Sequence, residues 1–328
     1  LCPRYVEVVA FGMKAPRDMY FESVVRPEHD RMLLLDSLCY RFTYHSREQW
    51  KENLERGLVT VNGVVAGPET VARKGDKVVY HVENYDEPEV PTDFSTVFED
   101  EEFMLVAKPA GIPVHHTARI FYNTFVSVVR RETGYETATP MHRLDRDTGG
   151  LMLFAKYAES AARFQKNLDR ILLRKFYMAV VRGEFPHEEY RCDTPLREDP
   201  ASRIRLKMYP FDDGKPCTTI FRKMRSVVRD GETFTAIECE LLTGRKHQIR
   251  AHLASLGFPI VGDRLYAFDG LYYEKMAEGA LTEDDFRVLG AHSHMLYAYK
   301  VELLLPYWDT PRTFVCENFP SEMKDLIR

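Results

Sequence analysis

The chain has 328 residues, of which 45% are hydrophobic and 29% are charged, as in an ordinary globular protein. Its length allows about two domains, and no stretch approaches the roughly 18 consecutive apolar residues of a membrane-spanning helix, so we expect no membrane partner. The net charge is −5, so the chain lacks the basic excess that is common in nucleic-acid-binding proteins. Phosphate contacts need only a local basic patch, however, so RNA or DNA is not excluded as a partner.

The six cysteines are widely scattered, at Cys2, Cys39, Cys192, Cys217, Cys239 and Cys316. None lies in a Cys-x-x-Cys pair, which argues against a zinc site and against a redox pair. Such usage is typical of a reducing compartment, so we expect a cytoplasmic protein. The chain starts at Leu1 with neither a Met nor a signal-peptide pattern, from which we expect a trimmed or processed start.

Residues 1–27 show no clear pattern, but residues from about 28 to 82 read as a compact module. Helical apolar spacing runs over Asp30–Phe42. A second helix is expected to start at Ser46, which forms a capping-box pattern with Gln49, and to end at Gly57. Short strands are expected at Val59–Val61 and Lys77–Tyr80, with a turn at Asn62-Gly63.

The stretch from Asn84 to Phe94 is rich in proline and acidic residues, which is typical of an extended linker. We therefore divide the chain into an N-terminal region (1–83), a linker (84–95) and a larger domain (96–328).

The larger domain alternates strand-like runs with a few helical ones. Strands are expected at Phe103–Ala107, Leu151–Ala155, Tyr177–Val181, Thr233–Leu242 and Lys300–Leu305. Helices are expected at Thr124–Thr133, Ala158–Asn167 and His247–Leu256. Because the alternation is irregular, we predict an α+β fold with a mixed, mainly antiparallel central sheet and flanking helices around a cleft.

Motifs for nucleotide phosphates, dinucleotides and zinc proteases are absent from the sequence. Two His-rich spots, His115-His116 and His292-Ser293-His294, lack Cys or carboxylate partners at useful spacing. The sequence therefore predicts neither a metal nor a cofactor.

Functional side chains concentrate in the loop His142–Gly150, which reads His-Arg-Leu-Asp-Arg-Asp-Thr-Gly-Gly between apolar segments. Burying so many polar groups unpaired would cost several kcal/mol each, so the loop is expected at a functional surface. Asp145 stands between Arg143 and Arg146, and this arrangement alone fits a structural salt-bridge cluster as well as it fits a catalytic carboxylate. A second charged segment, Thr243–His252, is expected to open a helix and to direct amides and basic side chains at one spot.

Taken together, the motifs resemble RluA-type pseudouridine synthases, enzymes that isomerise uridine in RNA. Two positions depart from the family pattern: Cys217 replaces an Ala and Lys246 replaces a Thr. The segment Gly270–Arg287 looks specific to this chain, and the family's last motif survives only loosely at Ala291-His292-Ser293. The matching segments are Lys108–Val114, His142–Gly150, Lys175–Gly183, Gly214–Thr219, Thr243–Arg250 and Gly262–Tyr266.

The resemblance implies roles for individual residues. Asp145 corresponds to the catalytic carboxylate, and Arg250 corresponds to the arginine that pairs with it. The alternative for Arg250 is a weak, purely structural salt bridge on the helix surface. Tyr177 would stack on the base with its hydroxyl available for proton transfer, and Arg143 would fill the gap that the flipped uridine leaves. Further substrate-binding residues are expected to be His142, Lys175, Arg245, His247 and Gln248.

The implied reaction breaks the bond from ribose to base nitrogen, rotates the base and rebuilds the link through carbon. An ionised Asp145 can attack the sugar covalently or remove a ribose proton as a general base, and the sequence leaves both routes open. The implied substrate is ribosomal or transfer RNA, without DNA and without a cofactor, and we expect a monomer. The rivals are a non-catalytic RNA-binding or ribosome-assembly factor on the same scaffold and, less favoured, a nucleoside hydrolase that releases uracil.

The N-terminal module resembles a small RNA-binding fold, here called S-four-like, that occurs in a ribosomal protein and in many pseudouridine synthases. Residues 1–95 contain 12 Lys and Arg against 16 Asp and Glu, a net charge of −4 that disagrees with a tight grip on RNA. A basic stripe of Arg41, Arg47, Lys51 and Arg56 remains a candidate contact. RNA binding and a purely structural role both stay open for this module.

Overall fold

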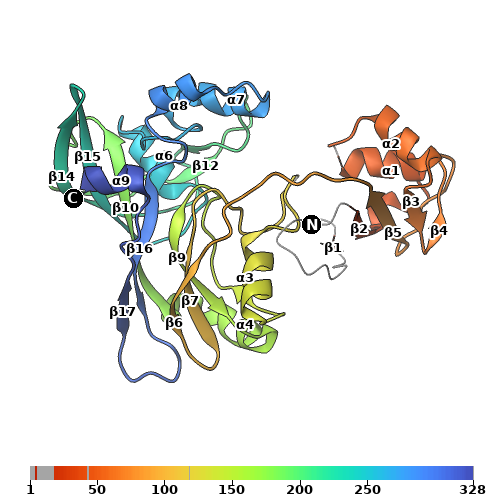
Figure 1. Ribbon diagram of the computed structural model, residues 1–328, viewed down its shortest axis with the longest axis horizontal. Coiled ribbons are helices and arrows are strands. Elements are labelled where there is room, and N and C mark those ends of the chain that lie inside the picture. The colour runs from red at the N-terminus through yellow and green to blue at the C-terminus, as the bar shows by residue number, and fades with distance from the viewer. Residues whose placement is uncertain (1–3, 6–17, 43, 118, 328) are drawn as a thin grey trace. The chain divides into compact units, whose positions relative to one another are not determined.

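The computed structural model describes residues 4–5, 18–42, 44–117 and 119–327 (Figure 1). The chain forms two compact units. The small unit comprises Leu1–Glu89 and His115–Thr124, and the large unit comprises Val90–Val114 and Phe125–Arg328. Cys2, and most of the segment 1–27 that showed no pattern, lie outside the described residues.

In its described residues, the small unit is an antiparallel sheet with two α-helices. Its strands follow the spatial order β1-β2-β5-β3-β4. They are β1 (Arg4–Tyr5), β2 (Met19–Val24), β3 (Val59–Val61), β4 (Val64–Val65) and β5 (Lys77–Val82). The helices are α1 (Leu34–Arg41) and α2 (Arg47–Glu55), preceded by the 3₁₀ turn Pro27–His29.

Local signals in the small unit act as the sequence predicts. The Ser46 side chain accepts from the backbone of Gln49, whose side chain accepts from the Ser46 backbone, which completes the capping box of α2. Asn62 and Gly63 have φ values of 50° and 84°, so they form the tight turn that joins β3 to β4. The first helix was expected from Asp30 but begins at Leu34, because the Arg31 N–H donates to the Ala72 carbonyl and Leu33 forms an isolated β-bridge instead.

The linker stretch contains a buried anchor. Residues 85–94 form neither helix nor strand, yet only 8% of Glu87 is exposed. Its carboxylate accepts hydrogen bonds from the backbone N–H groups of Phe121, Tyr122 and Asn123, at 2.8, 2.9 and 2.7 Å. This acidic residue therefore fixes a distant segment of the small unit, a role that composition could not reveal.

A ten-stranded sheet forms the centre of the large unit. The spatial order is β11-β14-β15-β10-β16-β9-β7-β6, with β17 on β16 and β8 on β9. The strands are β6 (Ser95–Glu99), β7 (Phe103–Lys108), β8 (Thr139–Pro140), β9 (Gly149–Ala155), β10 (Leu172–Arg182), β11 (Glu189–Cys192), β14 (Thr219–Arg229), β15 (Glu232–Leu241), β16 (Leu296–Leu303) and β17 (Arg312–Val315). In the described part of this sheet, β9 and β16 pair in parallel and the other pairs are antiparallel. The predicted α+β fold with a mainly antiparallel sheet is confirmed.

Helices and a small ribbon flank this sheet (Figure 1). Helix α4 packs on β9, α6 packs on β14, and α9 packs on β10, β14 and β15. The helices are α3 (Phe125–Thr133), α4 (Ala158–Phe164), α5 (Leu168–Ile171), α6 (Gln248–Ser255), α7 (Leu271–Ala277), α8 (Glu283–Leu289) and α9 (Ser321–Ile327), with 3₁₀ turns at Gln165–Asn167 and Ala267–Gly270. The two-stranded ribbon pairs β12 (Leu196–Glu198) with β13 (Met208–Pro210).

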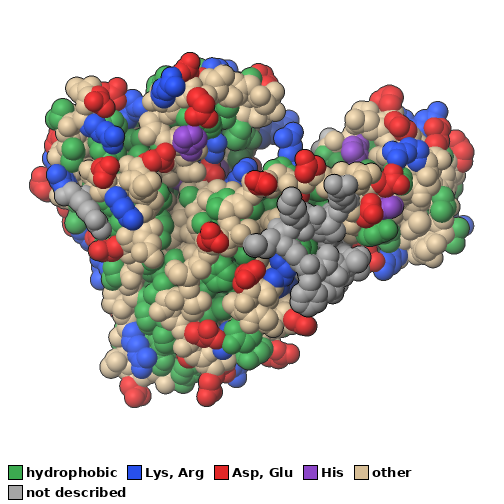
Figure 2. Space-filling view, viewed as in Figure 1, with side chains coloured by type: hydrophobic (Ala, Val, Ile, Leu, Met, Phe, Trp, Pro, Cys, Tyr) green, Lys and Arg blue, Asp and Glu red, His purple; other side chains and the backbone are tan. Residues whose placement is uncertain are grey.

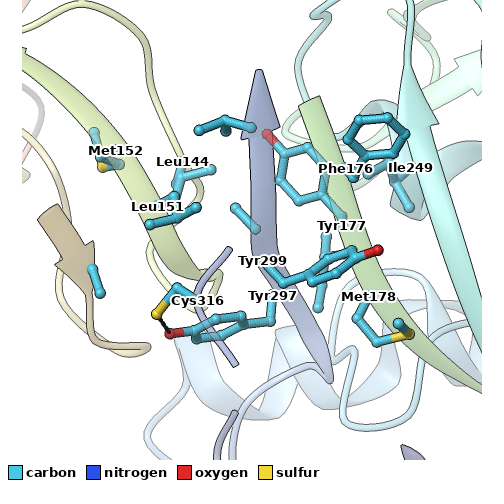
Figure 3. Packing of buried hydrophobic residues seen from close by; sticks show 14 of the residues in the cluster. Leu144, Leu151, Met152, Phe176, Tyr177, Met178, Ile249, Tyr297, Tyr299 and Cys316 are labelled. Carbon is cyan, nitrogen blue, oxygen red and sulfur yellow. Dashed lines mark hydrogen bonds between the residues drawn. The ribbon is translucent and has the colours of Figure 1, made fainter. Parts of the chain in front are cut away.

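The main core lies where β9, β10 and β16 run side by side (Figure 3). Leu151 on β9 and Tyr177 on β10 lie on either side of β16 and are both buried, and Leu144 joins them from the loop that precedes β9. This loop is the polar segment that contains Asp145. The core therefore supports the loop directly.

Two glycines allow β9 to approach β16 closely. Gly149 pairs with Tyr297 and Gly150 with Ala298. Gly150 has a φ of 111°, and a Cβ on it would lie 2.2 Å from the Ala298 carbonyl oxygen. A side chain at this position would push the two strands apart just after the polar loop.

Gly150→Ala is therefore expected to destabilise the large unit by at least about 3 kcal/mol, through backbone strain and overpacking together. Urea unfolding measures the effect. Gly231→Ala is the matched control, because Gly231 also has a positive φ (79°) but its added Cβ would meet nothing within 4 Å. Equal losses in the two variants would contradict a role for the β9–β16 contact.

Candidate active site

A carboxylate and a guanidinium meet at the centre of the large unit. Asp145 lies in the loop before β9, and Arg250 lies in the first turn of α6. The NH1 group of Arg250 donates to Oδ2 of Asp145 at 2.7 Å. The Asp145 side chain is 30% exposed, whereas that of Arg250 is 8% exposed. The arrangement offers a carboxylate to a ligand while its cationic partner stays in the protein.

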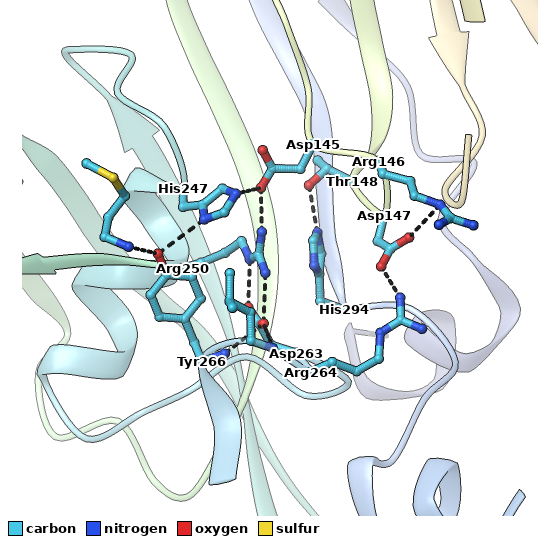
Figure 4. A network of polar contacts seen from close by, with 12 residues as sticks. Asp145, Arg146, Asp147, Thr148, His247, Arg250, Asp263, Arg264, Tyr266 and His294 are labelled. Atoms are coloured by element: carbon cyan, nitrogen blue, oxygen red, sulfur yellow. Dashed lines mark hydrogen bonds and ion pairs between the residues drawn. The ribbon is translucent and has the colours of Figure 1, made fainter. Parts of the chain in front are cut away.

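A second, fully buried carboxylate fixes Arg250 from the other side (Figure 4). Asp263 accepts from Nε of Arg250 at 2.7 Å and from NH2 at 2.9 Å, which is a bidentate pair. The same carboxylate accepts from the backbone N–H groups of Leu265 and Tyr266 at 2.9 and 3.1 Å. Arg250 is thus held rigidly between two carboxylates and cannot turn away from Asp145.

The charges keep Asp145 ionised. Burial alone would raise the pKa of its carboxyl, but the charge of Arg250, followed by the charges of His247 and His294 and by the Arg250 hydrogen bond, lowers this pKa to about 2. The pKa of Asp263 is lowered for the same reason, against the effect of its burial. At neutral pH the site therefore presents a carboxylate that is ready to act as nucleophile or base.

The residues that follow Asp145 are each tied to a different part of the large unit. Arg146 donates from Nε to the Gly111 carbonyl at 2.9 Å. Asp147 forms an ion pair with Arg264, and the Thr148 hydroxyl lies 2.7 Å from Nε2 of His294. These contacts hold the loop in one conformation before any ligand binds.

Lys108, at the end of β7, connects the segment Lys108–Val114 to this loop. Its buried ammonium group lies 2.9 Å from each of three carbonyl oxygens, those of Pro109, Ile112 and Arg146. Burial lowers the pKa of this amine, and the carboxylates of Asp147 and Asp145 oppose the shift. The lysine therefore acts inside the protein as a structural tie.

His247 faces Asp145 from the residue that precedes α6. Its Nε2 lies 3.9 Å from Oδ2 of Asp145, and its Nδ1 lies 3.2 Å from the Tyr266 hydroxyl oxygen. The backbone is left-handed, with a φ of 54°, a strained conformation that is typical of functional sites. Burial lowers the pKa of His247 to about 4 despite the nearby Asp145 carboxylate, so the ring is neutral at pH 7.

Tyr177 and Lys175 approach the site from β10. Only 7% of Tyr177 is exposed, and burial, followed by the charge of Asp145, raises the pKa of its hydroxyl. The amine of Lys175 lies close to the segment that leads to α6, since a Cβ on Gly244 would lie 3.5 Å from it. Burial lowers the pKa of Lys175.

The remaining residues expected to bind substrate differ in how many hydrogen bonds their side chains already make within the protein. The Gln248 amide is saturated: it donates to Thr218 and Thr219 and accepts from Thr243 and Arg245.

Nε2 of His142 accepts from the Leu153 N–H at 3.1 Å. Arg245 and Arg143 are exposed. Arg245 is only lightly engaged, at 3.3 Å from the Pro216 carbonyl oxygen.

Sequence reasoning missed several residues that organise the site. Lys108, Asp263 and Tyr266 were noted only as parts of matching segments, and His294 only as a member of a His-rich spot. These residues are visible in the sequence, but the residues that they contact lie far away along the chain, so their roles could not be inferred from it. His292, the other half of that His-rich spot, is exposed and lies 3.3 Å from Glu322.

Within the described residues, no group of three or more His, Cys, Asp and Glu side chains is placed to hold a metal ion. The same part of the chain contains no helix that combines the length and the apolar character needed to cross a bilayer.

The buried histidines predict how stability depends on pH. Burial lowers the pKa values of His142, His247 and His294 from 6.5 to about 4. As the pH falls below 6.5 the unfolded chain takes up protons that the folded chain refuses, so stability is full above pH 6.5 and declines towards pH 4. Between pH 7 and pH 5 we expect the free energy of unfolding, measured in urea, to fall by on the order of 1 to 2 kcal/mol per histidine. His294→Gln should reduce this loss by about a third; equal stability at both pH values would contradict the expectation.

Comparisons with known proteins agree with the motifs and the geometry. A family model described as RNA pseudouridylate synthase matches residues 102–255. The mitochondrial tRNA pseudouridine(32) synthase of Saccharomyces cerevisiae is 34% identical over 254 residues, which cover 77% of this chain and 54% of the yeast protein. A Synechocystis protein named as an uncharacterized RNA pseudouridine synthase is 28% identical over 277 residues, which cover 83% of this chain and 94% of that protein.

The fold is shared with a solved human structure, that of RNA pseudouridylate synthase domain containing 1, with a TM-score of 0.55. That match has 20% identity and covers 71% of this chain and 86% of the human one, so it supports the fold alone. The chain spans about half the length of the yeast relative. With the family model, the relatives and the fold in agreement, the chain belongs to the RNA pseudouridylate synthase family.

Proposed function

We propose that this chain isomerises uridine to pseudouridine in RNA. The observation that carries the proposal is the ion-pair chain Asp145–Arg250–Asp263, which offers one ionised, partly exposed carboxylate on a rigid support. Catalysis at the sugar needs such a group in a fixed orientation. The product is an isomer of the substrate, so the reaction needs neither a cofactor nor an energy source.

Each site residue has a proposed part in the reaction. Asp145 attacks the ribose or removes a ribose proton, and Arg250 keeps it ionised and oriented. Tyr177, buried next to Asp145, stacks on the extruded base. Arg143 is exposed in the same loop and occupies the gap in the RNA stack, because the reacting atoms cannot be reached inside a helix.

Phosphate contacts are proposed to be local. On the face of the large unit drawn in Figure 2, basic side chains are interspersed with acidic ones rather than gathered in one field. Two other exposed cations near the site, Arg245 and Lys246, are the proposed contacts to the RNA phosphate backbone. His142 and Lys175 support the same region from more buried positions, and Gln248 fixes the shape of the segment before α6.

An S-four-like role for the small unit in RNA binding remains a proposal. The cations of the basic stripe already have partners. Arg47 pairs with Asp36 at 2.6 Å and Arg56 with Glu83 at 2.6 Å. Lys51 lies 3.7 Å from Glu55 and Arg41 donates to the Val24 carbonyl. Exposed pairs of this kind are weak, so phosphates can compete for them.

Transfer RNA is the proposed substrate class, because the yeast relative is named for a tRNA position. Mapping pseudouridines by chemical labelling in cells with and without the gene tests this directly. Loss of a pseudouridine from tRNA is expected, and loss from ribosomal RNA alone would overturn the choice. We further propose a monomer that acts on RNA rather than DNA or a membrane. Its proposed compartment is the reducing cytoplasm, which suits the free thiols of Cys39, Cys192, Cys217, Cys239 and Cys316.

The activity itself is tested by tritium release from RNA labelled at carbon 5 of uridine, since that hydrogen leaves when the new carbon bond forms. The purified chain is expected to release tritium equally well with and without EDTA, because the proposed residues supply all the chemistry. Release that stops in EDTA and returns with a divalent ion would contradict the metal-free mechanism.

A further inference from the structure

The active site contains a hydrogen-bond donor whose target is not yet assigned, the imidazole of His247. The ring lies between two groups: Nε2 is 3.9 Å from Oδ2 of Asp145, and Nδ1 is 3.2 Å from the Tyr266 hydroxyl oxygen. Only 9% of the His247 side chain is exposed. Figure 4 shows the ring directed at Asp145 on one side and at Tyr266 on the other.

The contacts of Tyr266 determine which ring nitrogen carries the proton. The Met208 backbone N–H donates to the Tyr266 hydroxyl oxygen at 2.8 Å. In the described part of the chain, the acceptor within hydrogen-bond range of the Tyr266 O–H is Nδ1 of His247. A buried hydroxyl that donates to nothing is costly, so the phenol proton points at Nδ1. The proton of the neutral ring therefore resides on Nε2, the nitrogen that faces Asp145.

Both members of the pair are fixed from behind. The Tyr266 backbone N–H donates to Asp263 at 3.1 Å, and the Arg250 guanidinium lies 5.1 Å from the centre of the Tyr266 ring. His247, the N-cap residue of α6, adopts a left-handed backbone conformation. The donor thus has a defined position and direction relative to the reactive carboxylate.

We propose that Tyr266 positions His247 so that its Nε2–H donates a hydrogen bond to the 2′-hydroxyl of the target uridine. The inference rests on the proposed function and specifies how that site recognises ribose. At 3.9 Å the donor is too far from Asp145 to hydrogen-bond the carboxylate itself.

On either proposed route, Asp145 acts at C1′ or C2′ of the ribose. The 2′-hydroxyl is bonded to C2′ and is adjacent to C1′, so it comes within reach of a donor beside the reacting oxygen. This hydroxyl is also the group that lets a protein distinguish RNA from DNA at a given site. His247 would then determine sugar specificity, and Tyr266 would act through it as a positioning residue.

The test compares two RNAs: a stem–loop that carries the target uridine located by mapping, and the same stem–loop with 2′-deoxyuridine there. Dissociation constants are measured by fluorescence anisotropy with the full chain carrying Asp145→Asn, which prevents turnover. We expect the uridine RNA to bind about tenfold more tightly, the value of one hydrogen bond. The second substitution, His247→Asn, suits the left-handed backbone, but its shorter amide does not reach the position of Nε2. Adding it should lower the preference for the uridine RNA to less than about twofold.

Three further variants separate recognition from stability. His247→Gln should keep most of the preference, since its amide nitrogen reaches the position of Nε2, and Tyr266→Phe should reduce it partly by freeing the tautomer. Tyr297→Phe should leave it unchanged. Tyr297 is the matched control because it is a buried tyrosine whose hydroxyl lies 3.5 Å from Sγ of Cys316.

An unchanged preference in folded His247→Asn overturns the proposal, as does equal weakening of both RNAs, which would mean that the donor serves the base or the carboxylate. If His247→Asn does not fold, the contrast between Tyr266→Phe and Tyr297→Phe decides in the same way. Tritium release by the wild-type chain, measured in parallel, tests the proposed function separately, because the binding preference does not require turnover.

Discussion

Asp145→Asn is expected to lower pseudouridine formation by at least about 10³-fold while RNA binding changes little. The amide has nearly the shape of the carboxylate but can neither attack the sugar nor accept a proton from it. Tritium release from uridine labelled at carbon 5 measures turnover, and a filter-binding assay measures affinity.

Asp147→Asn is the matched control for this substitution. It removes one negative charge from the same loop, two residues away, and breaks the ion pair with Arg264. We expect it to keep activity within about tenfold of the wild type, because its carboxylate only supports the loop. Normal turnover by Asp145→Asn, or equal losses in the two variants, would refute the assignment of Asp145.

The second large effect is expected at Asp263, which does not touch the substrate. Asp263→Ala leaves the buried Arg250 with one partner and removes the acceptor of two backbone N–H groups. Breaking a buried pair in this way costs about 3 to 5 kcal/mol. We therefore expect a large fall in the free energy of unfolding, measured in urea, together with a strong loss of kcat because Arg250 no longer holds Asp145 in place.

Asp285→Ala provides the comparison for Asp263. Asp285 also has a cationic partner, Lys275 at 2.7 Å, and accepts from the Thr282 backbone, but it belongs to the capping box of α8. Its loss is expected to cost about 1 to 2 kcal/mol without a change in kcat. If Asp263→Ala lowers the free energy of unfolding and kcat no more than Asp285→Ala does, the catalytic carboxylate is supported by other residues.

Features that depend on neighbouring residues could be predicted from the sequence. The capping box of Ser46 and Gln49 and the turn at Asn62-Gly63 form as expected because both are closed by residues a few positions apart. The apolar runs that became β7 and β9 were recognised because burial on both faces leaves them uniformly hydrophobic. Local chemistry is enough for such elements.

Features that depend on distant partners were not predictable in this way. Strand β14 was missed because its basic and apolar residues alternate irregularly, and only pairing with β11 and β15 makes it a strand. Glu87 looked like a solvated linker residue, and nothing near it indicates the three amides that it binds. Likewise, the resemblance placed Asp145 with Arg250, but the bidentate support from Asp263 becomes visible only when the chain is folded.

The carboxylate beside Arg250 is proposed to rearrange uridine and not simply to cleave it. The direct test is chromatography of the nucleosides and free bases from a tRNA transcript incubated with the purified chain. Pseudouridine is expected to appear in an amount equal to the uridine lost, with no free uracil. Release of uracil, or unaltered uridine after incubation with folded protein, would contradict it.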